Sequence, residues 1–304
     1  MLLRHIRYLM AVAEQGNFTR AAETLRVSQP ALSQQIRQLE SELGGQLFDR
    51  SGRTVRLTDF GSAYVDYARR ALLDLEAGRR ALDDVRDLTR GHVRVAVTPT
   101  FTEYLVGPLV GQFRDLHPGV SIELSESPLE GIETALNDDQ IDLGIGFSDV
   151  RSEDIEVEPL FSERLTLVAG GAHRLTRTSL AVIPSQLAEV PLALLTGNFV
   201  SRRYVDDYFL AHRIKPDIAL QANSISAVLK LVRRGEIAAI LPSAMQHEHG
   251  DLSYVPLDPP FPTRTVALLR RRHAYRTVAS VRFCALLTEM LLTGELSNLK
   301  TFAA

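Results

Sequence analysis

The chain has 304 residues, 45% of them hydrophobic, so it is too long for one ordinary domain and can fill two or three cores. Its formal net charge is -3, yet eight arginines against five acidic residues give residues 1–58 a charge of +3 and leave -6 for the remainder. A basic N-terminal segment suits binding to a polyanion such as nucleic acid. The average charge of the chain alone would argue against such binding.

Cys284 is the only cysteine, so no intrachain disulfide can form and nothing indicates an oxidising compartment. The N-terminal segment lacks the charged start, unbroken apolar run and cleavage site of a signal peptide. No window approaches the ~18 apolar residues of a membrane span. We therefore expect a cytoplasmic protein without a membrane partner.

The first forty residues predict three short helices. Apolar residues recur at helical spacing over residues 6–13 and again over 18–25, with Gly16 and Asn17 between the two stripes. Asn17 can cap the second helix, and Ser28 can cap a third, in whose first turn Pro30 is tolerated.

The third predicted helix has one apolar side and one polar side. At 100° per residue Leu32, Ile36 and Leu39 share the buried side. Serine, glutamine and arginine on the opposite side can reach base edges or phosphates in a major groove. Exposed glutamines also occur on ordinary helical domains. This row of polar residues therefore indicates DNA binding only in combination with the features that follow it in the chain. The residues on the polar side are Pro30, Ser33, Gln34, Arg37 and Gln38.

Residues 47–58 follow with two short extended pieces around Gly52. This pattern predicts a β-hairpin that presents Arg50, Arg53 and Arg56, as a wing would meet a phosphate backbone. Together with the polar helix face and the basic charge, the hairpin favours DNA binding.

The segments 18–23, 27–33, 36–40 and 47–50 resemble the winged helix-turn-helix of LysR-type transcriptional regulators. The resemblance implies a DNA-binding domain over residues 1–58, double-stranded promoter or operator DNA as partner, and an activator that contacts RNA polymerase. It also implies that Ser33, Gln34 and Arg37 approach bases while Thr19, Arg50 and Arg53 hold phosphates. The expected DNA-binding residues are Thr19, Ser28, Gln29, Pro30, Ser33, Gln34, Arg37, Gln38, Arg50 and Arg53.

A long helix is predicted next, over residues 59–90, with Thr58 as its cap. It would reach about Thr89 and span roughly 45 Å at 1.5 Å per residue. Its apolar edge is typical of a coiled-coil seam, which favours self-association to a dimer and then a tetramer. The seam residues are Phe60, Tyr64, Tyr67, Ala71, Leu75, Gly78, Leu82 and Val85.

Residues 91–304 alternate between strand and helix patterns twice, which predicts two α/β lobes with parallel strands. We expect lobe I to comprise about residues 91–162 and 268–304, and lobe II about 163–267. The resemblance implies an effector domain similar to periplasmic binding proteins, with the ligand cleft between the lobes. Predicted strands cover residues 93–97, 120–124, 141–146, 191–195, 217–220 and 237–241.

Hydroxyl and amide side chains stand at three predicted strand-to-helix turns, where free backbone N–H groups would favour an anion. The alternative is that these side chains cap ordinary helices. The expected effector-binding residues are Thr98, Thr100, Thr196, Asn198, Phe199 and Asn223.

Within the LysR family, segments 87–91, 96–101 and 222–229 resemble regulators of bacterial cyanate degradation. This resemblance implies cyanate, a small linear anion, as the favoured effector. The predicted turns carry no arginine clamp, which argues against a large dicarboxylate. A different small-molecule effector remains the alternative.

An enzyme and a solute-binding protein are the alternatives to a regulator. An enzyme lacks support because no Ser-His-Asp spacing, Cys/His metal cluster or Gly-rich phosphate loop is present, and we expect no catalytic residue, metal or cofactor. His247 and His249 come nearest to a metal pair. A solute-binding protein would explain the second part of the chain but not its first ninety residues.

Overall fold

The computed structural model describes residues 2–52, 54–86, 91–177, 180–294, 296 and 300–301. The chain forms two compact units, Met1–Asp83 and Asp84–Ala304. Within the described residues, no helix is both long enough and apolar enough to span a bilayer.

The first unit begins with three helices, α1 (Leu3–Gln15), α2 (Phe18–Leu25) and α3 (Gln29–Leu43). Asn17 Oδ1 accepts hydrogen bonds from the first N–H groups of α2, and Ser28 Oγ accepts one from Ala31 at the start of α3. Gly16 ends α1 in the left-handed conformation, which glycine adopts without steric cost. The three predicted helices and both predicted caps are therefore confirmed.

The predicted hairpin is present as the antiparallel pair β1 (Phe48–Asp49) and β2 (Arg56–Leu57). The long helix α4 (Asp59–Arg86) follows, and Thr58 Oγ1 accepts the Gly61 N–H at its start. A side chain at Gly61 would collide with the Leu47 carbonyl, so glycine allows α4 to begin directly against the hairpin. The predicted end of this helix near Thr89 lies outside the described residues.

Part of α4 packs against the N-terminal helices and part of it is exposed. Val65 and Ala68 are buried in the same hydrophobic core as α1, α2 and α3, so the predicted linker shares the core of the N-terminal domain. Tyr64, predicted on the seam, packs against that core instead. The Val85 side chain lies outside the description. Four large hydrophobic side chains of the predicted seam are exposed in the single chain: Phe60 at 45%, Tyr67 at 73%, Leu75 at 55% and Leu82 at 61%.

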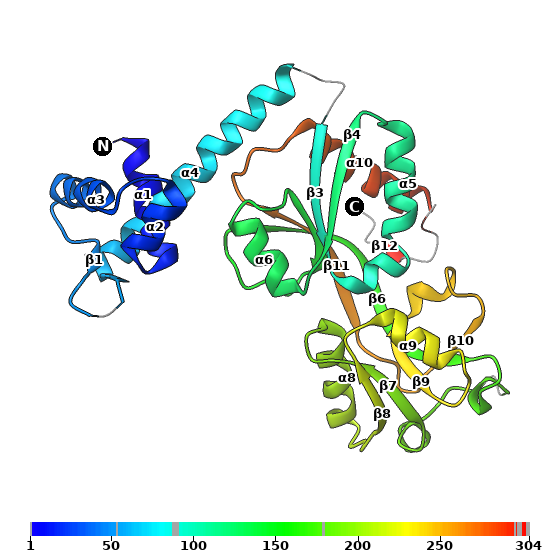
Figure 1. Ribbon diagram of the computed structural model, residues 1–304. Coiled ribbons are helices and arrows are strands. Elements are labelled where there is room, and N and C mark those ends of the chain that lie inside the picture. The colour runs from blue at the N-terminus through cyan, green and yellow to red at the C-terminus, as the bar shows by residue number, and fades with distance from the viewer. Residues whose placement is uncertain are drawn as a thin grey trace. The chain divides into compact units, whose positions relative to one another are not determined.

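Lobe I of the second unit has a parallel core sheet in the order β4-β3-β5. The C-terminal helix α10 packs on β3 and α5, so the chain returns to this lobe as predicted (Figure 1). Its elements are β3 (Gly91–Val97), the 3-10 helix η1 (Pro99–Glu103), α5 (Val106–Leu116), β4 (Val120–Glu126), α6 (Leu129–Asn137), β5 (Leu143–Phe147) and α10 (Val278–Thr293).

Lobe II also has a parallel core sheet, in which β7 lies parallel to both β8 and β9. The short strand β10 (Leu252–Val255), which the sequence pattern did not predict, pairs with the long strand β6. The other elements of this lobe are η2 (Arg174–Arg177), α7 (Pro184–Leu187), β7 (Pro191–Leu195), α8 (Val200–Ala211), β8 (Asp217–Ala222), α9 (Ile225–Val232), β9 (Ala238–Pro242) and η3 (Ser243–Gln246).

Two strands connect the lobes, β6 (Ile155–Gly170) and β11 (Thr263–Arg271) (Figure 1). Up to Arg164, β6 pairs with β11, which itself continues the lobe I sheet beside β5; from Leu165 onward β6 pairs with β9 and β10 of lobe II. Residues 300–301 form β12, which also pairs with β6. The predicted fold, a winged helix-turn-helix followed by a two-lobed α/β domain, is confirmed.

Candidate nucleic-acid interface and ligand cleft

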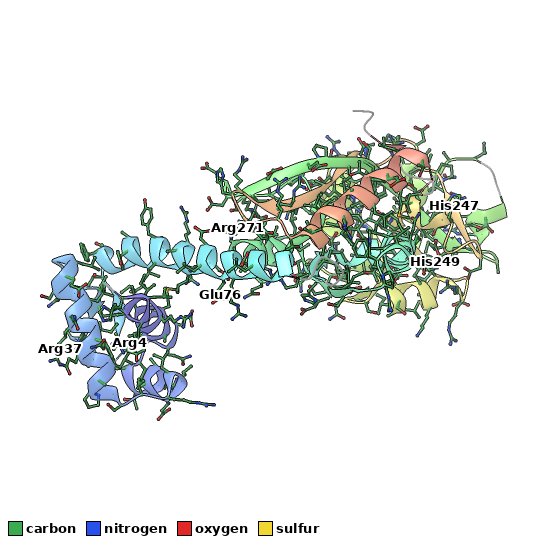
Figure 2. The ribbon with its side chains drawn as sticks, turned by 90° about the horizontal axis from the view of Figure 1, so that it is seen from above. Arg4, Arg37, Glu76, His247, His249 and Arg271 are labelled. Atoms are coloured by element: carbon green, nitrogen blue, oxygen red, sulfur yellow. The ribbon has the colours of Figure 1, made fainter. Side chains whose placement is uncertain are left out.

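The outward side of α3 carries most of the residues predicted to meet DNA. Gln34, Arg37 and Gln38 are exposed, and so are Ser28, Gln29 and Pro30 at the start of the helix. Figure 2 shows Arg37 projecting from α3. Amide and guanidinium groups on one exposed face can each present two hydrogen-bonding atoms to a base edge.

Ser33 departs from the prediction, because it is buried with 8% of its surface exposed. At 100° per residue Ser33 lies about 60° from the buried Ile36 but about 100° from Gln34. Its small side chain therefore falls at the border of the packed side, where neighbouring residues cover it. Direct base contact by Ser33 does not fit this position.

Gln35 holds α3 against α1, a role that the sequence pattern did not reveal. Its Oε1 accepts from Arg4 Nη2 at 3.1 Å and lies 3.0 Å from the ring Nε2 of the buried His5. These bonds fix the rotation of α3 and therefore the direction in which Gln34 and Gln38 point. The position of Gln35 directly before the buried Ile36 was the sequence feature that could have indicated this role.

The hairpin is coupled to α3 through Glu40. Its Oε1 accepts from the Leu47 and Phe48 N–H groups, and its Oε2 accepts from Arg50 Nη2 at 2.8 Å. The Arg50 guanidinium also lies 4.8 Å from the centre of the Phe18 ring. Arg50 is therefore held in place and partly neutralised, while its side chain stays 31% exposed.

Thr19 and Arg53 complete the predicted phosphate contacts. Thr19 is exposed in the first turn of α2, where its N–H is already bonded to Asn17. Arg53 lies outside the described residues. Beside it on the hairpin, the Ser51 hydroxyl and N–H bond to Asp49 and lower the pKa of that carboxyl.

A cavity of about 160 Å³ lies between the lobes of the second unit. It lies where α6 of lobe I and α8 of lobe II both begin, so two helix N-termini face it. Both signs of charge surround it. Its lining comprises Pro128, Leu129, Glu130, Glu133, Asp149, Arg151, Gly197, Asn198, Val200 and Arg203.

The predicted turn after β3 is built differently from the expectation. Five residues of 3-10 helix follow it, Pro99 has no N–H, and the Thr98 N–H is already bonded to Ile145 O. Two of the three N–H groups expected at this turn, at residues 98 and 99, are therefore not available to a ligand. Thr98 and Thr100 are both buried, and the Thr98 hydroxyl has no partner among the described residues.

The predicted effector residues of lobe II are dispersed. Asn198 lines the interlobe cavity, whereas Phe199 occupies the N-cap position of α8 without a side-chain cap bond and packs against a core that holds residues of both lobes. Asn223 is exposed, and the neighbouring Ser224 serves as an ordinary cap of α9. The Thr196 hydroxyl is buried without a partner among the described residues.

A buried arginine lies where the chain crosses between the lobes, outside the turns considered in the sequence. Arg264 lies on β11, its Nε donates to Glu163 Oε2 at 2.6 Å, and its side chain is 1% exposed. Glu163 also accepts from the Tyr104 hydroxyl. Burial, together with the nearby Glu163 carboxylate, raises the pKa of Tyr104, so this phenol remains a donor at neutral pH.

The two histidines considered for metal binding lie in lobe II and are labelled in Figure 2. His249 Nδ1 lies 3.1 Å from Arg233 Nη2, and its Nε2 lies 3.3 Å from Glu103 Oε2. An arginine cation therefore lies at one nitrogen and a carboxylate near the other, although His249 Nε2 has no hydrogen-bond partner within the described residues. Among the described residues, no group of three or more potential ligands is close enough to hold a metal.

Two family models match the chain. The model described as "Bacterial regulatory helix-turn-helix protein, lysR family" matches residues 3–62, and the model described as "LysR substrate binding domain" matches residues 86–292. Among curated relatives, a probable RuBisCO transcriptional regulator of Trichormus variabilis is 29% identical over 290 residues, covering 92% of this chain and 86% of the relative.

Solved structures show the same fold. A full-length OxyR variant from Pseudomonas aeruginosa has a TM-score of 0.70 at 24% identity, covering 100% of this chain and 99% of that one. Full-length CbnR in complex with its target DNA has a TM-score of 0.58 at 25% identity, covering 95% of this chain and 99% of that one.

Proposed function

The chain belongs to the LysR family of transcriptional regulators, and we propose that it binds promoter DNA through α3 and the hairpin of β1 and β2. The exposed row of Gln34, Arg37 and Gln38 on a helix tied to α1 is the observation that carries this proposal. In this proposal Arg37 contacts bases, whereas Thr19, Arg50 and Arg53 contact phosphates.

The division between base and phosphate contacts can be tested with two substitutions. Arg37→Ala should lower the preference for target over random DNA by about 1–3 kcal/mol, because base contacts carry sequence information. Arg53→Ala should weaken binding to both DNAs and reduce the salt dependence by roughly one ion. Fluorescence anisotropy across a salt series measures both effects, with Arg79→Ala on α4 as control. Equal loss of sequence preference in both variants would contradict the assignment.

We further propose that two copies pair along the exposed seam of α4 and that two dimers form a tetramer. Pairing would cover Tyr67, Leu75 and Leu82 and set the spacing between two copies of α3. Effector binding would then change DNA bending and contact with RNA polymerase, most simply as an activator.

The proposed effector is a small anion in the cleft between the lobes, and cyanate is the specific candidate. The support is the resemblance of segments 87–91, 96–101 and 222–229 to regulators of cyanate degradation. A thermal-shift screen with cyanate, azide, bicarbonate and small carboxylates tests it. A shift with another anion and none with cyanate would remove cyanate and keep the regulator.

The name of the Trichormus variabilis relative favours a second candidate, regulation of RuBisCO genes. Target identity can be separated from effector identity by capturing genomic fragments of the source organism on the purified protein. Recovery of DNA upstream of RuBisCO genes would support this candidate, and recovery of DNA upstream of cyanate-degradation genes would support the first.

A further inference from the structure

The C-terminal helix α10 is apolar on two opposite sides. Phe283, Leu287 and Met290 are buried in the hydrophobic core of the second unit. At 100° per residue, the side that faces away from these three carries a second row of mostly apolar residues, and every member of this row is exposed. A helix whose outer side meets only solvent carries charged residues there, whereas a helix that is apolar all round is normally buried. We call this row the α10 stripe, and it comprises Val278, Val281, Ala285, Thr288 and Leu292.

The spacing of the α10 stripe is that of a helix that pairs with another helix. Its members recur at intervals of three and four residues, as along a coiled-coil seam. Val281 is 50% exposed and Leu292 is 66% exposed, so large apolar side chains stand at both ends of the stripe. Thr288 does not interrupt it, because its hydroxyl donates to Cys284 O at 3.1 Å within the same helix. Covering Thr288 would therefore leave no hydroxyl donor unmatched.

Two charges of opposite sign border the α10 stripe. Arg282 and Glu289 are the only charged residues in the sequence of α10, and both are exposed. They are two helical turns apart, so both lie on the same edge of the stripe. Their midpoint along the helix falls beside Ala285.

A two-fold axis that crosses α10 beside Ala285 would match these charges to each other. Two helices related by such an axis run antiparallel, so Arg282 of one copy comes beside Glu289 of the second copy, and the reverse pair forms at the same time. The small side chain of Ala285 lies near the axis, where it allows the two helices to approach closely. A partner of unrelated sequence would not require opposite charges at equal distances from the centre of the stripe. The charge pattern therefore favours a second copy of this chain as the occupant.

The size of the α10 stripe indicates at which stage of assembly this contact acts. Five side chains per copy fall well short of the ~800 Å² per partner that a stable dimer of free chains buries. Two dimers, however, can meet through two such contacts. Once the first contact has formed, the second closes within one assembly and benefits from a high effective concentration.

We propose that α10 pairs antiparallel with α10 of a second copy and that this contact joins two dimers into a tetramer. The pairing rests on the proposed dimer along the α4 seam, and it names the second surface that a tetramer needs. A chain with two different two-fold contacts can assemble four copies into a closed tetramer.

Charge reversal on the full chain gives the first test. Arg282→Glu places two carboxylates beside each other at both ends of the contact, and it should raise the dimer–tetramer dissociation constant about tenfold at low salt. Glu289→Arg should have the same effect. The double variant restores both attractions with the signs exchanged, so its constant should return to within about threefold of that of the unchanged protein.

Sedimentation velocity over a concentration series measures these constants. Arg234→Glu is the matched control, because Arg234 is an exposed arginine of lobe II and its reversal changes the net charge by the same amount. Undiminished tetramer formation in both single variants, or no recovery in the double variant, would overturn the inference.

A second test changes the apolar part of the stripe. Val281→Asp would bury a charge in each copy, so it should raise the dimer–tetramer constant at least tenfold while leaving the dimer intact. Leu180→Asp, at an exposed leucine of lobe II, is the control. Tetramers of unchanged stability in Val281→Asp, or an unchanged protein that never exceeds a dimer, would contradict the pairing of α10.

A cross-link tests the α10 contact independently of the α4 seam and of DNA binding. In a Cys284→Ala background, Ala285→Cys places one thiol on each side of the axis, and mild oxidation should join two chains through a disulfide. Arg234→Cys in the same background should give no such product. Absence of the Ala285→Cys cross-link would overturn the inference even where the protein binds its target DNA. Formation of this cross-link together with loss of specific DNA binding would strike the proposed function alone.

Discussion

Cys284 illustrates how burial alone sets the chemistry of a side chain. The thiol lies on α10, and burial raises its pKa to about 11, with the nearby Glu158 carboxylate adding to the effect and Arg270 opposing it. Because burial disfavours the charged thiolate, the neutral form dominates at physiological pH. A redox role for this single thiol does not fit such an environment.

The raised pKa of Cys284 predicts slow thiol chemistry. At pH 8 its reaction with an aromatic disulfide reagent should be roughly a hundredfold slower than that of a free cysteine, because the thiolate fraction is about that much smaller. The rate should still climb almost tenfold between pH 9 and pH 10, where a free thiol with a pKa of about 8.5 approaches its plateau. The denatured protein provides the control. A native rate that reaches its plateau by pH 10 would contradict the raised pKa.

Individual residues also differ in whether the sequence alone could predict their contacts. The Asn17 and Ser28 caps were predictable because a cap bonds to N–H groups two or three residues away. The burial of Ser33 depends on what packs beside α3, which helical spacing does not encode. The pairing of Arg264 with Glu163 joins residues 101 positions apart and required the register of β6 against β11.

At the scale of elements, α4 changes its surroundings along its length. Val65 and Ala68, near its start, are buried in the N-terminal core, which fixes the rotation of the helix relative to α3. Leu75 and Leu82 lie within about 40° of Ala68 around the helix, yet both are exposed, so the apolar stripe continues beyond the N-terminal core. Periodicity predicted the seam and placed Tyr64 on it, because spacing alone does not show how far along the helix the N-terminal core reaches.

Leu75→Asp should weaken self-association of the protein. Burial of one leucine at the interface contributes about 2 kcal/mol to the free energy of association. Each copy would lose this contribution and would also bury a charge in the interface. The dimer dissociation constant should therefore rise at least tenfold. Analytical ultracentrifugation over a concentration series measures it. Asp66→Lys, about 180° around the helix from Leu75, is the matched charge change. The same sedimentation for Leu75→Asp and the unchanged protein would exclude this seam as the interface.

At the scale of the whole effector domain, side chains of the two lobes meet directly. The Tyr204 hydroxyl of lobe II donates to Asp149 Oδ2 of lobe I at 2.9 Å. The alternation of strands and helices predicted both lobes, because parallel α/β units have a recognisable period. Which side chains meet across the cleft follows only from the closed arrangement, since no local pattern links residue 149 to residue 204.

The bond between Tyr204 and Asp149 should bias the domain toward its closed form. Burial raises the pKa of Tyr204, and the Asp149 carboxylate adds to this effect, so the phenol donates throughout the physiological range. Tyr204→Phe should lower the stability of the closed form relative to the open form by about 1 kcal/mol. Amide hydrogens of residues 145–151 in lobe I should therefore exchange about fivefold faster. Tyr208→Phe is the control, because that hydroxyl bonds to Pro259 O within lobe II. If both variants, or neither, changed exchange in lobe I, the bond across the cleft would not control closure.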